Sequence, residues 1–372
     1  MRKKLEFQAD RIETVLALHK VPARVTGGTV TPRWVRFQVL PAVGAKISKI
    51  KRLSEEMAAA LDVSSCRVSR RGAAVAVEVP RDDPQPVRLL PLIRQLKDGK
   101  QPVPPITAIL GLAEDGESLL IRLPSPDVAH ILVAGTTGSG KTVLLQAMIL
   151  SLAMANRREH LALVLIDPKG HAFKPFEDLP HLARPVIHEL EETTEALYSL
   201  VRLMERRGTT GTSTPRVIVV IDELADLLMV GGKPVRHALT RLTQRGREAG
   251  IHIIAATQKP TAAVLGPLIK ANFPVRLVGR VTSIEDARTA AGWSGTGAER
   301  LTGRGDFLAV AEGRVIRFQA AHVSPDEIRE VVRRMEHGQG RGLSADPSLA
   351  PSRQVLLPWP VSRLPEVFRG GV

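Results

Sequence analysis

The chain has 372 residues, a formal net charge of +14 and one cysteine, Cys66. A positive surplus of this size predicts a polyanionic partner, first nucleic acid and second an anionic membrane surface; a solvated basic surface is the plain alternative. A single cysteine excludes an internal disulfide and a cysteine-based zinc site, which suits a reducing cytoplasm. Aromatic residues make up only 3% of the chain, which argues against single-strand binding through base stacking.

The sequence predicts a cytoplasmic protein with no membrane insertion. Its longest apolar run, at 144–155, is interrupted by Gln146 and Ser151 and is too short to span a bilayer. The basic N-terminus lacks the apolar stretch of a signal peptide.

Residues 1–100 are predicted to form a small α+β domain with a structural or assembly role, because they contain no catalytic constellation. Helical spacing of Leu5, Ala9, Ile12 and Leu16 indicates a first amphipathic helix. The further expected elements are a turn at Gly27 and Gly28, a strand at 34–40, a helix at 47–61, and two strands at 67–69 and 73–79.

Residues 101–336 are predicted to form an α/β domain with a mostly parallel sheet between helix layers. After a Pro-rich junction comes a hairpin, at 107–112 and 118–123, around an Asp115-Gly116 turn. Continuous apolar runs then alternate with amphipathic helices, and such runs suit strands covered on both faces. These runs lie at 131–134, 162–166, 217–221, 251–256 and 275–281.

The end of this domain and the tail have their own signals. The tripeptide Arg304-Gly305-Asp306 is interpreted as a turn that leads into a strand. Ser324, Pro325 and Glu327 predict a capping box at the start of the last helix. The tail, 337–372, is rich in Gly, Pro and Ser and is expected to be poorly ordered.

A complete Walker A pattern lies between a predicted strand and a predicted helix, which leaves little room for a chance match. Its glycines let backbone N–H groups face phosphates at a helix N-terminus. We expect Lys141 to neutralise the β and γ phosphates of ATP and the Thr142 hydroxyl to hold Mg²⁺. The pattern consists of Gly135, Thr136, Thr137, Gly138, Ser139, Gly140, Lys141 and Thr142.

A second motif, at 216–223, supplies the carboxylates of a Walker B site. A strand beside the P-loop is expected to end in Asp222, which orients Mg²⁺, and Glu223, which polarises the attacking water as general base. An acidic strand end or helix cap is the structural alternative. Gln258 follows another strand and is a candidate for sensing the γ-phosphate, with an ordinary loop polar group as the alternative.

Six segments of the second domain form an ordered series: HILVAGTTGSGKT, LVLIDPKG, VIVVIDELADLLM, REAGIHIIAATQKP, LIKANFPVRL and GRGDFL. In order and spacing they resemble the motor domain of the FtsK/SpoIIIE DNA translocases over residues 106–323. The N-terminal unit also resembles the small domain that precedes this motor. The resemblance implies a RecA-like fold, a hexameric homo-oligomeric ring around double-stranded DNA, and ATP hydrolysis at subunit interfaces.

Two parts of the usual family layout are absent from the sequence. No transmembrane region precedes the motor, and the chain after Met335 is too short for the family's winged-helix domain. We therefore expect a translocase of a mobile element or another specialised setting.

The resemblance also indicates candidate residues outside the motifs. Arg247 matches a family arginine after Walker B and is expected to act on the neighbouring subunit's ATP, with Arg288 as a second candidate and a surface salt bridge as the alternative. Two loops are expected to bind DNA phosphates without reading bases. Their basic residues are Lys233, Arg236 and Arg241 in and after the first loop, and Lys259 and Lys270 in the second.

The sequence thus predicts an ATP-dependent double-stranded DNA translocase. One alternative is a secretion or conjugation-type P-loop ATPase that moves protein or single-stranded DNA. Another is a P-loop binding module or packaging scaffold without motor activity, against which the Asp222-Glu223 pair argues.

Overall fold

The computed structural model describes residues 2–31, 33–63, 65–72, 74–98, 103–114, 116–260 and 272–337. The chain divides into two compact units, with the division between Pro86 and Val87. Three of the predictions fall outside the described residues: Asp115 in the hairpin turn, Lys270 as a DNA contact, and the tail from 338 onward.

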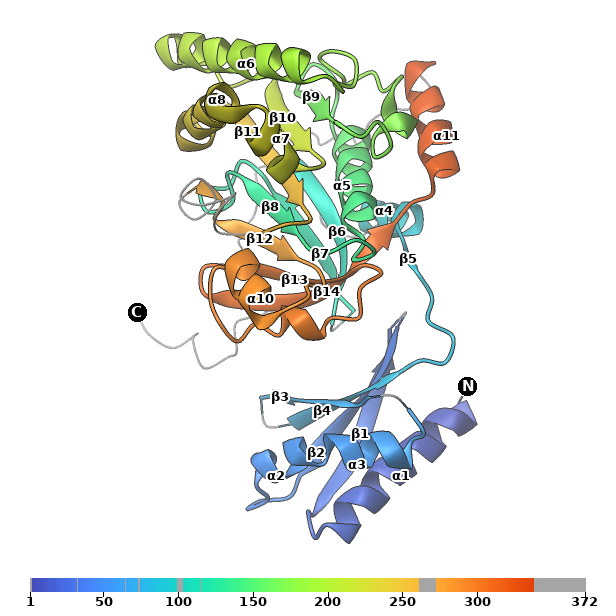
Figure 1. Cartoon of the computed structure of the whole chain (residues 1–372). Helices are drawn as coiled ribbons and strands as arrows, with labels where there is room; N and C mark the ends of the chain where they lie inside the picture. Colours follow the sequence, from blue (N-terminus) through green and yellow to red (C-terminus); the bar gives the residue numbers. More distant parts are fainter. Residues whose placement is uncertain are drawn as a thin grey trace, which may run out of the picture. The chain divides into compact units, whose positions relative to one another are not determined.

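The first unit is a four-stranded antiparallel sheet, in the order β1-β2-β4-β3, with helices packed against it (Figure 1). Its core holds Ile12 and Leu16 of the first helix, as their spacing predicts. The expected helix at 47–61 is divided at Leu53 into two short helices. The elements are α1 (Arg2–Leu18), β1 (Ala23–Val30), β2 (Trp34–Pro41), α2 (Ile47–Arg52), α3 (Ser54–Ala60), β3 (Arg67–Arg71) and β4 (Ala74–Pro80).

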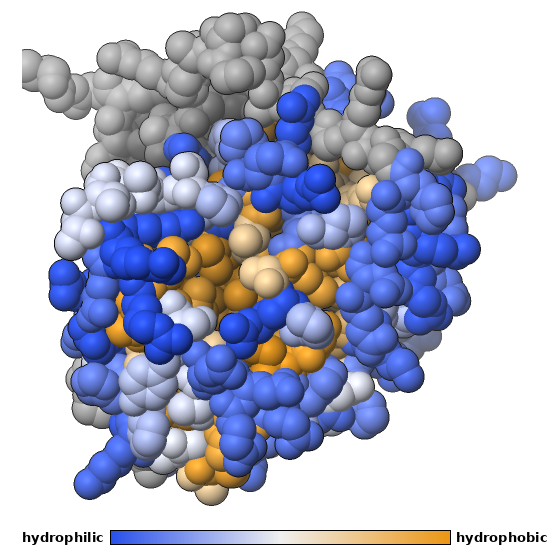
Figure 2. Space-filling view, turned by 90° about the horizontal axis from the view of Figure 1, so that it is seen from above, coloured by the Kyte–Doolittle hydropathy of each residue, from blue (hydrophilic) through white to orange (hydrophobic). Residues whose placement is uncertain are grey.

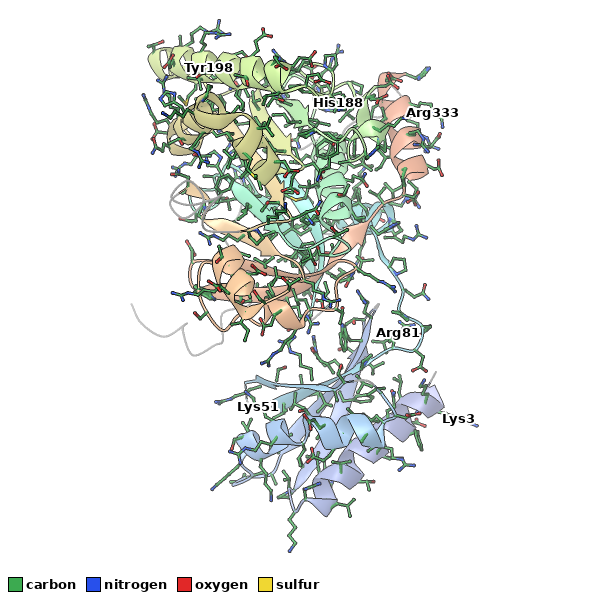
Figure 3. All side chains as sticks on the ribbon, viewed as in Figure 1. Lys3, Lys51, Arg81, His188, Tyr198 and Arg333 are labelled. Atoms are coloured by element: carbon green, nitrogen blue, oxygen red, sulfur yellow. The ribbon has the colours of Figure 1, made fainter. Side chains whose placement is uncertain are left out.

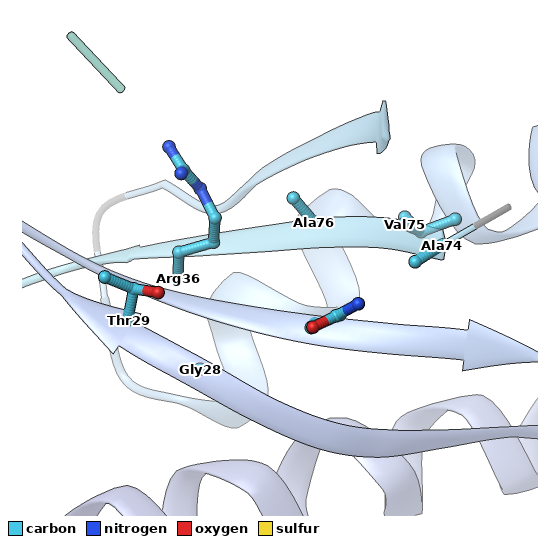
Figure 4. A pocket seen from close by; sticks show the side chains of 7 residues that line it. Gly28, Thr29, Arg36, Ala74, Val75 and Ala76 are labelled. Carbon is cyan, nitrogen blue, oxygen red and sulfur yellow. The ribbon is translucent and has the colours of Figure 1, made fainter. Parts of the chain in front are cut away.

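The predicted turn at Gly27 and Gly28 is wrong, because both residues lie inside β1. A register shift between Val25 and Gly27 marks a bulge where β1 pairs with β2. A Cβ atom at Gly28 would lie 2.6 Å from the carbonyl oxygen of Arg36, so glycine here permits a close approach of two backbones. A hollow on this sheet is lined by Gly28, Thr29, Arg36 and neighbouring residues of β4 (Figure 4).

The second unit is built on a large mixed sheet in the order β7-β6-β14-β13-β12-β8-β11-β10-β9. Strands β12, β8, β11, β10 and β9 are parallel, whereas the pairs from β12 to β7 are antiparallel. Its strands are β5 (Val87–Arg88), β6 (Thr107–Ala113), β7 (Ser118–Arg122), β8 (Ile131–Ala134), β9 (Leu161–Ile166), β10 (Arg216–Ile221), β11 (Ile251–Thr257), β12 (Val275–Val278), β13 (Asp306–Ala311) and β14 (Arg314–His322). Its α-helices are α4 (Leu89–Asp98), α5 (Lys141–Ala155), α6 (Leu190–Thr210), α7 (Leu224–Val230), α8 (Gly232–Arg245), α10 (Ile284–Ala291) and α11 (Pro325–Glu336).

The five apolar runs and the hairpin were therefore predicted at the right places. The parallel arrangement, however, holds for only one half of the sheet. The hairpin of β13 and β14 was not predicted as such, although β13 begins at Asp306, directly after the predicted turn. The sequence placed the domain boundary at residue 100, but β5 pairs with β14 and α4 packs on α5 and β6, so residues 87–98 join the second unit.

Helices cover both faces of the parallel strands (Figure 1). Along β10, Val217, Val219 and Ile221 pack into the apolar cluster of α6, α7 and α8. The alternate residues Ile218 and Val220 pack into the cluster of α4, α5 and α11. Each such side chain contributes about 1.5–3 kcal/mol when fully buried, which explains the unbroken apolar runs.

The outer surface shows the opposite composition. Hydrophilic residues dominate the face seen in Figure 2, with apolar residues between them.

At the start of α11 the predicted capping box is confirmed, since the Ser324 hydroxyl accepts from the Glu327 N–H and the Glu327 carboxylate accepts from the Ser324 N–H. Among the described helices, none has both the length and the apolar composition of a bilayer span.

Two buried histidines lie under the amino ends of β8 and β11. His130 Nδ1 accepts a hydrogen bond from the N–H of Ile253 at 3.0 Å, and His252 Nδ1 donates to the carbonyl oxygen of Ala129 at 2.9 Å. Burial lowers the pKa of His130 to about 3 and that of His252 to about 4. Both rings are therefore neutral in the folded protein at any pH above these values.

We expect the free energy of unfolding to fall as the pH drops from about 6.5 towards 4. In this window His130 and His252 take up protons in the unfolded chain but not in the folded chain. Each of them therefore lowers the free energy of unfolding by about 1.4 kcal/mol per pH unit. His252→Asn keeps a donor for Ala129 and removes one titrating group, so its urea unfolding should depend less on pH than that of the wild type. The exposed His171→Asn is the control. Identical pH slopes for His252→Asn and the wild type would contradict this explanation.

Candidate nucleotide-binding site

The P-loop joins the end of β8 to the start of α5, as the Walker A pattern predicts. Gly138 and Gly140 adopt positive φ angles of 78° and 102°, which favour glycine. A Cβ atom at Gly140 would also come within 2.7 Å of the main-chain nitrogen of Gly305. The curled backbone thus places its N–H groups at the N-terminus of a 15-residue helix, where an anion is stabilised.

Lys141 lies over this loop and is 7% exposed. Its Nζ donates to the carbonyl oxygens of Gly135 at 2.7 Å and Thr136 at 3.1 Å. Burial lowers the pKa of the Lys141 ammonium, while the carboxylates of Glu223 and Asp222 act in the opposite direction. The ammonium is thus held at the loop, beside the acidic end of the site.

A turn from the antiparallel half of the sheet supports the P-loop from behind. The N–H of Arg304 donates to the carbonyl oxygen of Gly138 at 2.9 Å, and the N–H of Gly305 donates to that of Ser139 at 2.8 Å. Asp306, 4% exposed, anchors the turn because its carboxylate accepts two hydrogen bonds from Arg317, both of 2.7 Å. Sequence reasoning identified this turn but did not assign it to the site.

The strand order corrects one prediction about the Walker B strand. β10 does not lie beside β8, because β11 lies between them. Local sequence patterns do not encode which strands pair, so this order could not be read from the motifs. As a consequence, the polar residues at the carboxyl end of β11 lie between the P-loop and the Walker B carboxylates.

Negative charge gathers at the carboxyl ends of β9 and β10. Asp222 follows β10, and burial raises its pKa to about 6, with Asp167 and Glu223 adding to the effect. Asp167, which is fully buried, accepts hydrogen bonds from the N–H groups of Gly170, Ala172 and Phe173. The charged form of the Asp222 carboxylate is thus disfavoured, and a nearby divalent cation would stabilise it. Hard oxygen donors are the ligands Mg²⁺ prefers.

Glu223 is 2% exposed and is held by the end of β11. Its Oε1 accepts from Thr257 Oγ1 at 2.9 Å and from the N–H of Gln258 at 3.1 Å, and its Oε2 accepts from the same N–H at 3.2 Å. Lys169 Nζ lies 4.0 Å from Glu223 Oε2 and 3.4 Å from Asp226 Oδ2.

Asp167 and Lys169 were missed as site residues, although Asp167 follows the apolar strand β9 directly and Lys169 comes two residues later. That position was the available signal, because the carboxyl ends of parallel strands share one edge of the sheet. His188, labelled in Figure 3, secures the same segment by donating from Nδ1 to the carbonyl oxygen of Asp167 at 2.7 Å.

Gln258 connects the central strand to the P-loop. Its Oε1 accepts a hydrogen bond from Thr137 Oγ1 at 2.8 Å, and its main-chain N–H contacts Glu223. The structure thus brings together the P-loop, Asp222, Glu223 and Gln258 at one edge of the sheet.

The predicted arginines lie elsewhere. Arg247 is exposed just before the amino end of β11, and its Nη1 donates to the carbonyl oxygen of Pro126 at 3.2 Å. Because β11 runs parallel to β8, this is the sheet edge opposite the P-loop. Arg288 lies on the exposed side of α10.

The described DNA-contact candidates differ in their surroundings. Lys233, in the first turn of α8, and Lys259, directly after β11, are exposed, whereas Arg236 is half-buried. Arg241 forms an ion pair with Glu205 of α6. The two exposed lysines are thus the candidates with the freest access to a polyanion.

Fold and site together define a P-loop nucleotide-binding protein with a RecA-like fold. The chain belongs to the FtsK/SpoIIIE family. The sequence profile of the FtsK/SpoIIIE family matches residues 92–210 and 208–262, and that of the FtsK alpha domain matches residues 1–81.

Curated relatives agree with this assignment. The chain is 34% identical over 364 residues to the DNA translocase SpoIIIE of Bacillus subtilis, and 36% identical over 358 residues to the DNA translocase FtsK of Bacillus cereus. These alignments cover 89% and 87% of this chain but 45% and 44% of the relatives. The chain thus spans less than half the length of the curated relatives it matches.

Solved structures support the fold. The conjugation coupling protein TcpA of pCW3, solved with ATPγS, matches with a TM-score of 0.58 at 20% identity over 88% of this chain and 99% of that chain. The cytoplasmic domain of the type VII secretion ATPase EccC of Thermomonospora curvata matches with a TM-score of 0.58 at 25% identity, over 67% of this chain and 34% of that chain. The predicted RecA-like fold is confirmed.

Proposed function

We propose that the protein is an ATP-dependent double-stranded DNA translocase that works as a homo-oligomeric ring of six subunits. The observation that carries the proposal is the convergence of Lys141, Asp222 and Glu223 at one edge of the sheet in a chain of this family. A binding module or scaffold has no need of a buried carboxylate next to the P-loop lysine.

Each site residue has one role in this proposal. Lys141 and the P-loop N–H groups bind the ATP phosphates, and Gln258 detects the γ-phosphate. Thr142 and Asp222 would hold Mg²⁺, which would supply neutralising charge at the phosphates. Glu223 takes the proton of the attacking water.

DNA is bound through its phosphates. The chain carries a formal charge of +14, and Lys233 and Lys259 extend from exposed positions near element ends, with Arg236, Arg241 and Lys270 as further candidates. Lysine and arginine bind phosphate without reading base edges, which suits a motor that moves over any sequence.

The test is the ATPase rate without DNA, with single-stranded DNA and with linear duplex DNA. The proposal expects the largest rate with the duplex. Stimulation by single-stranded DNA alone would contradict the proposal and indicate a conjugation-type ATPase. The absence of turnover under all three conditions would indicate a binding module.

We expect Arg247 to act in trans, since it lies at the opposite edge of the sheet from its own P-loop. Arg247→Ala alone should then be inactive, because the neighbouring transition state loses a positive charge. Mixing it with Glu223→Gln subunits should restore part of the activity, since some interfaces combine Arg247 of one subunit with Glu223 of another. Full turnover by Arg247→Ala alone would transfer the role to Arg288.

A further inference from the structure

One buried hydroxyl connects the candidate general base to a candidate DNA contact. Thr257 Oγ1 donates to Glu223 Oε1 at 2.9 Å and accepts from the main-chain N–H of Lys259 at 3.2 Å. Thr257 is fully buried, so water does not compete for either bond. A displacement of the chain at Lys259 therefore acts directly on the hydroxyl that holds Glu223.

The same contacts restrain the carboxylate of Glu223. A general base must reach the attacking water and accept its proton. Here both carboxylate oxygens accept hydrogen bonds from β11 and its end, and the side chain is 2% exposed. These three hydrogen bonds hold the carboxylate in one orientation.

Other neighbours of Glu223 do not provide the same restraint. Lys169 Nζ lies 4.0 Å from Oε2, and its side chain is 47% exposed, so solvent screens this pair. The restraint therefore comes from Thr257 and from the N–H of Gln258. The Gln258 side chain also accepts a hydrogen bond from Thr137 of the P-loop. Residues 257–259 therefore contact both the P-loop and Glu223, and they include Lys259, a candidate DNA contact.

We propose that Thr257 is a positioning residue that keeps Glu223 in a restrained orientation until Lys259 binds a DNA phosphate. Binding shifts the main chain at 258–259, which loosens the bond from Lys259 to Thr257 and the bond from Thr257 to Glu223. The carboxylate then turns to the water beside the γ-phosphate. This inference rests on the proposed function and explains how duplex DNA raises the ATPase rate.

The test is Thr257→Val, which keeps the β-branched shape and removes the hydroxyl. We expect the ATPase rate without DNA to rise about 10- to 100-fold, the equivalent of one hydrogen bond to a charged group. The rate with saturating duplex DNA should stay within about twofold of the wild type, because the same activated state is reached. The ratio of the two rates should therefore collapse.

Three further variants make this result specific. Thr257→Ser retains the hydroxyl and should keep the wild-type ratio. Thr243→Val, which removes a buried hydroxyl from α8, should leave both rates unchanged. Lys259→Ala should lose stimulation by DNA. If the valine variant does not fold, Thr257→Ala gives the same comparison.

The outcomes separate the inference from the proposed function. A lower DNA-stimulated rate without a rise in the basal rate would overturn the restraint, because Thr257 would then orient Glu223 for catalysis. Unchanged rates in Thr257→Val would overturn it as well. If duplex DNA fails to stimulate even the wild type, the proposed function fails, while a raised basal rate in Thr257→Val still supports the restraint on Glu223.

Discussion

Lys141→Ala should abolish ATP turnover and weaken ATP binding, whereas Glu223→Gln should abolish turnover and leave binding intact. Lys141 lies on the P-loop. In the proposed mechanism its ammonium meets phosphate charge in the ground state and in the transition state. Glu223 does not touch the P-loop in the described contacts, and its proposed role begins only with proton transfer from water. Loss of a general base lowers the rate about 10²- to 10⁴-fold.

Equilibrium binding of a fluorescent ATP analogue and steady-state turnover separate the two effects. The glutamine retains a carbonyl oxygen that can accept from Thr257, so the fold around the site should survive. Glu248→Gln, an exposed change near the end of α8, is the matched control. Turnover of Glu223→Gln at the wild-type rate would show that another group is the base.

DNA affinity should fall steeply with salt and vary little between duplex sequences. Binding of lysines to phosphates releases counterions, and no side chain is assigned to a groove edge. Replacing both Lys233 and Lys259 with alanine should reduce the slope of log affinity against log salt by about 2, or about 1 for each lysine that no longer neutralises a phosphate. Lys174→Ala, an exposed lysine of the same unit, is the control.

Single strands should bind more weakly than the duplex, because the low aromatic content provides few stacking platforms. ATP binding should persist in the double variant, since neither lysine contacts the P-loop in the described structure. Equal or tighter binding of single strands would contradict a translocase of double-stranded DNA and favour the conjugation-type alternative.

The site was predictable where its chemistry lies in contiguous residues. The P-loop, the acidic end of β10 and the polar end of β11 each carry a local signal, because an apolar strand precedes a fixed set of polar groups. Their convergence followed from the rule that the carboxyl ends of parallel strands share an edge.

What could not be predicted depends on pairing between distant segments. The position of β11 between β8 and β10 decides that Thr257 contacts Glu223, and no local pattern encodes it. The support of the P-loop by Arg304 and Gly305 likewise requires β13 to follow β12 in the sheet. The glycine pair in β1 gave the wrong signal, because glycine serves a close backbone approach as well as a turn.

Translocation itself is tested most directly by displacement of a third strand from linear duplex DNA. A triplex-forming oligonucleotide bound far from the DNA end can be removed only by a protein that moves along the duplex. We expect the wild type to release it in the presence of ATP, and Glu223→Gln to bind the same DNA without releasing it. Duplex-stimulated ATP hydrolysis with no displacement of the third strand would contradict a translocase.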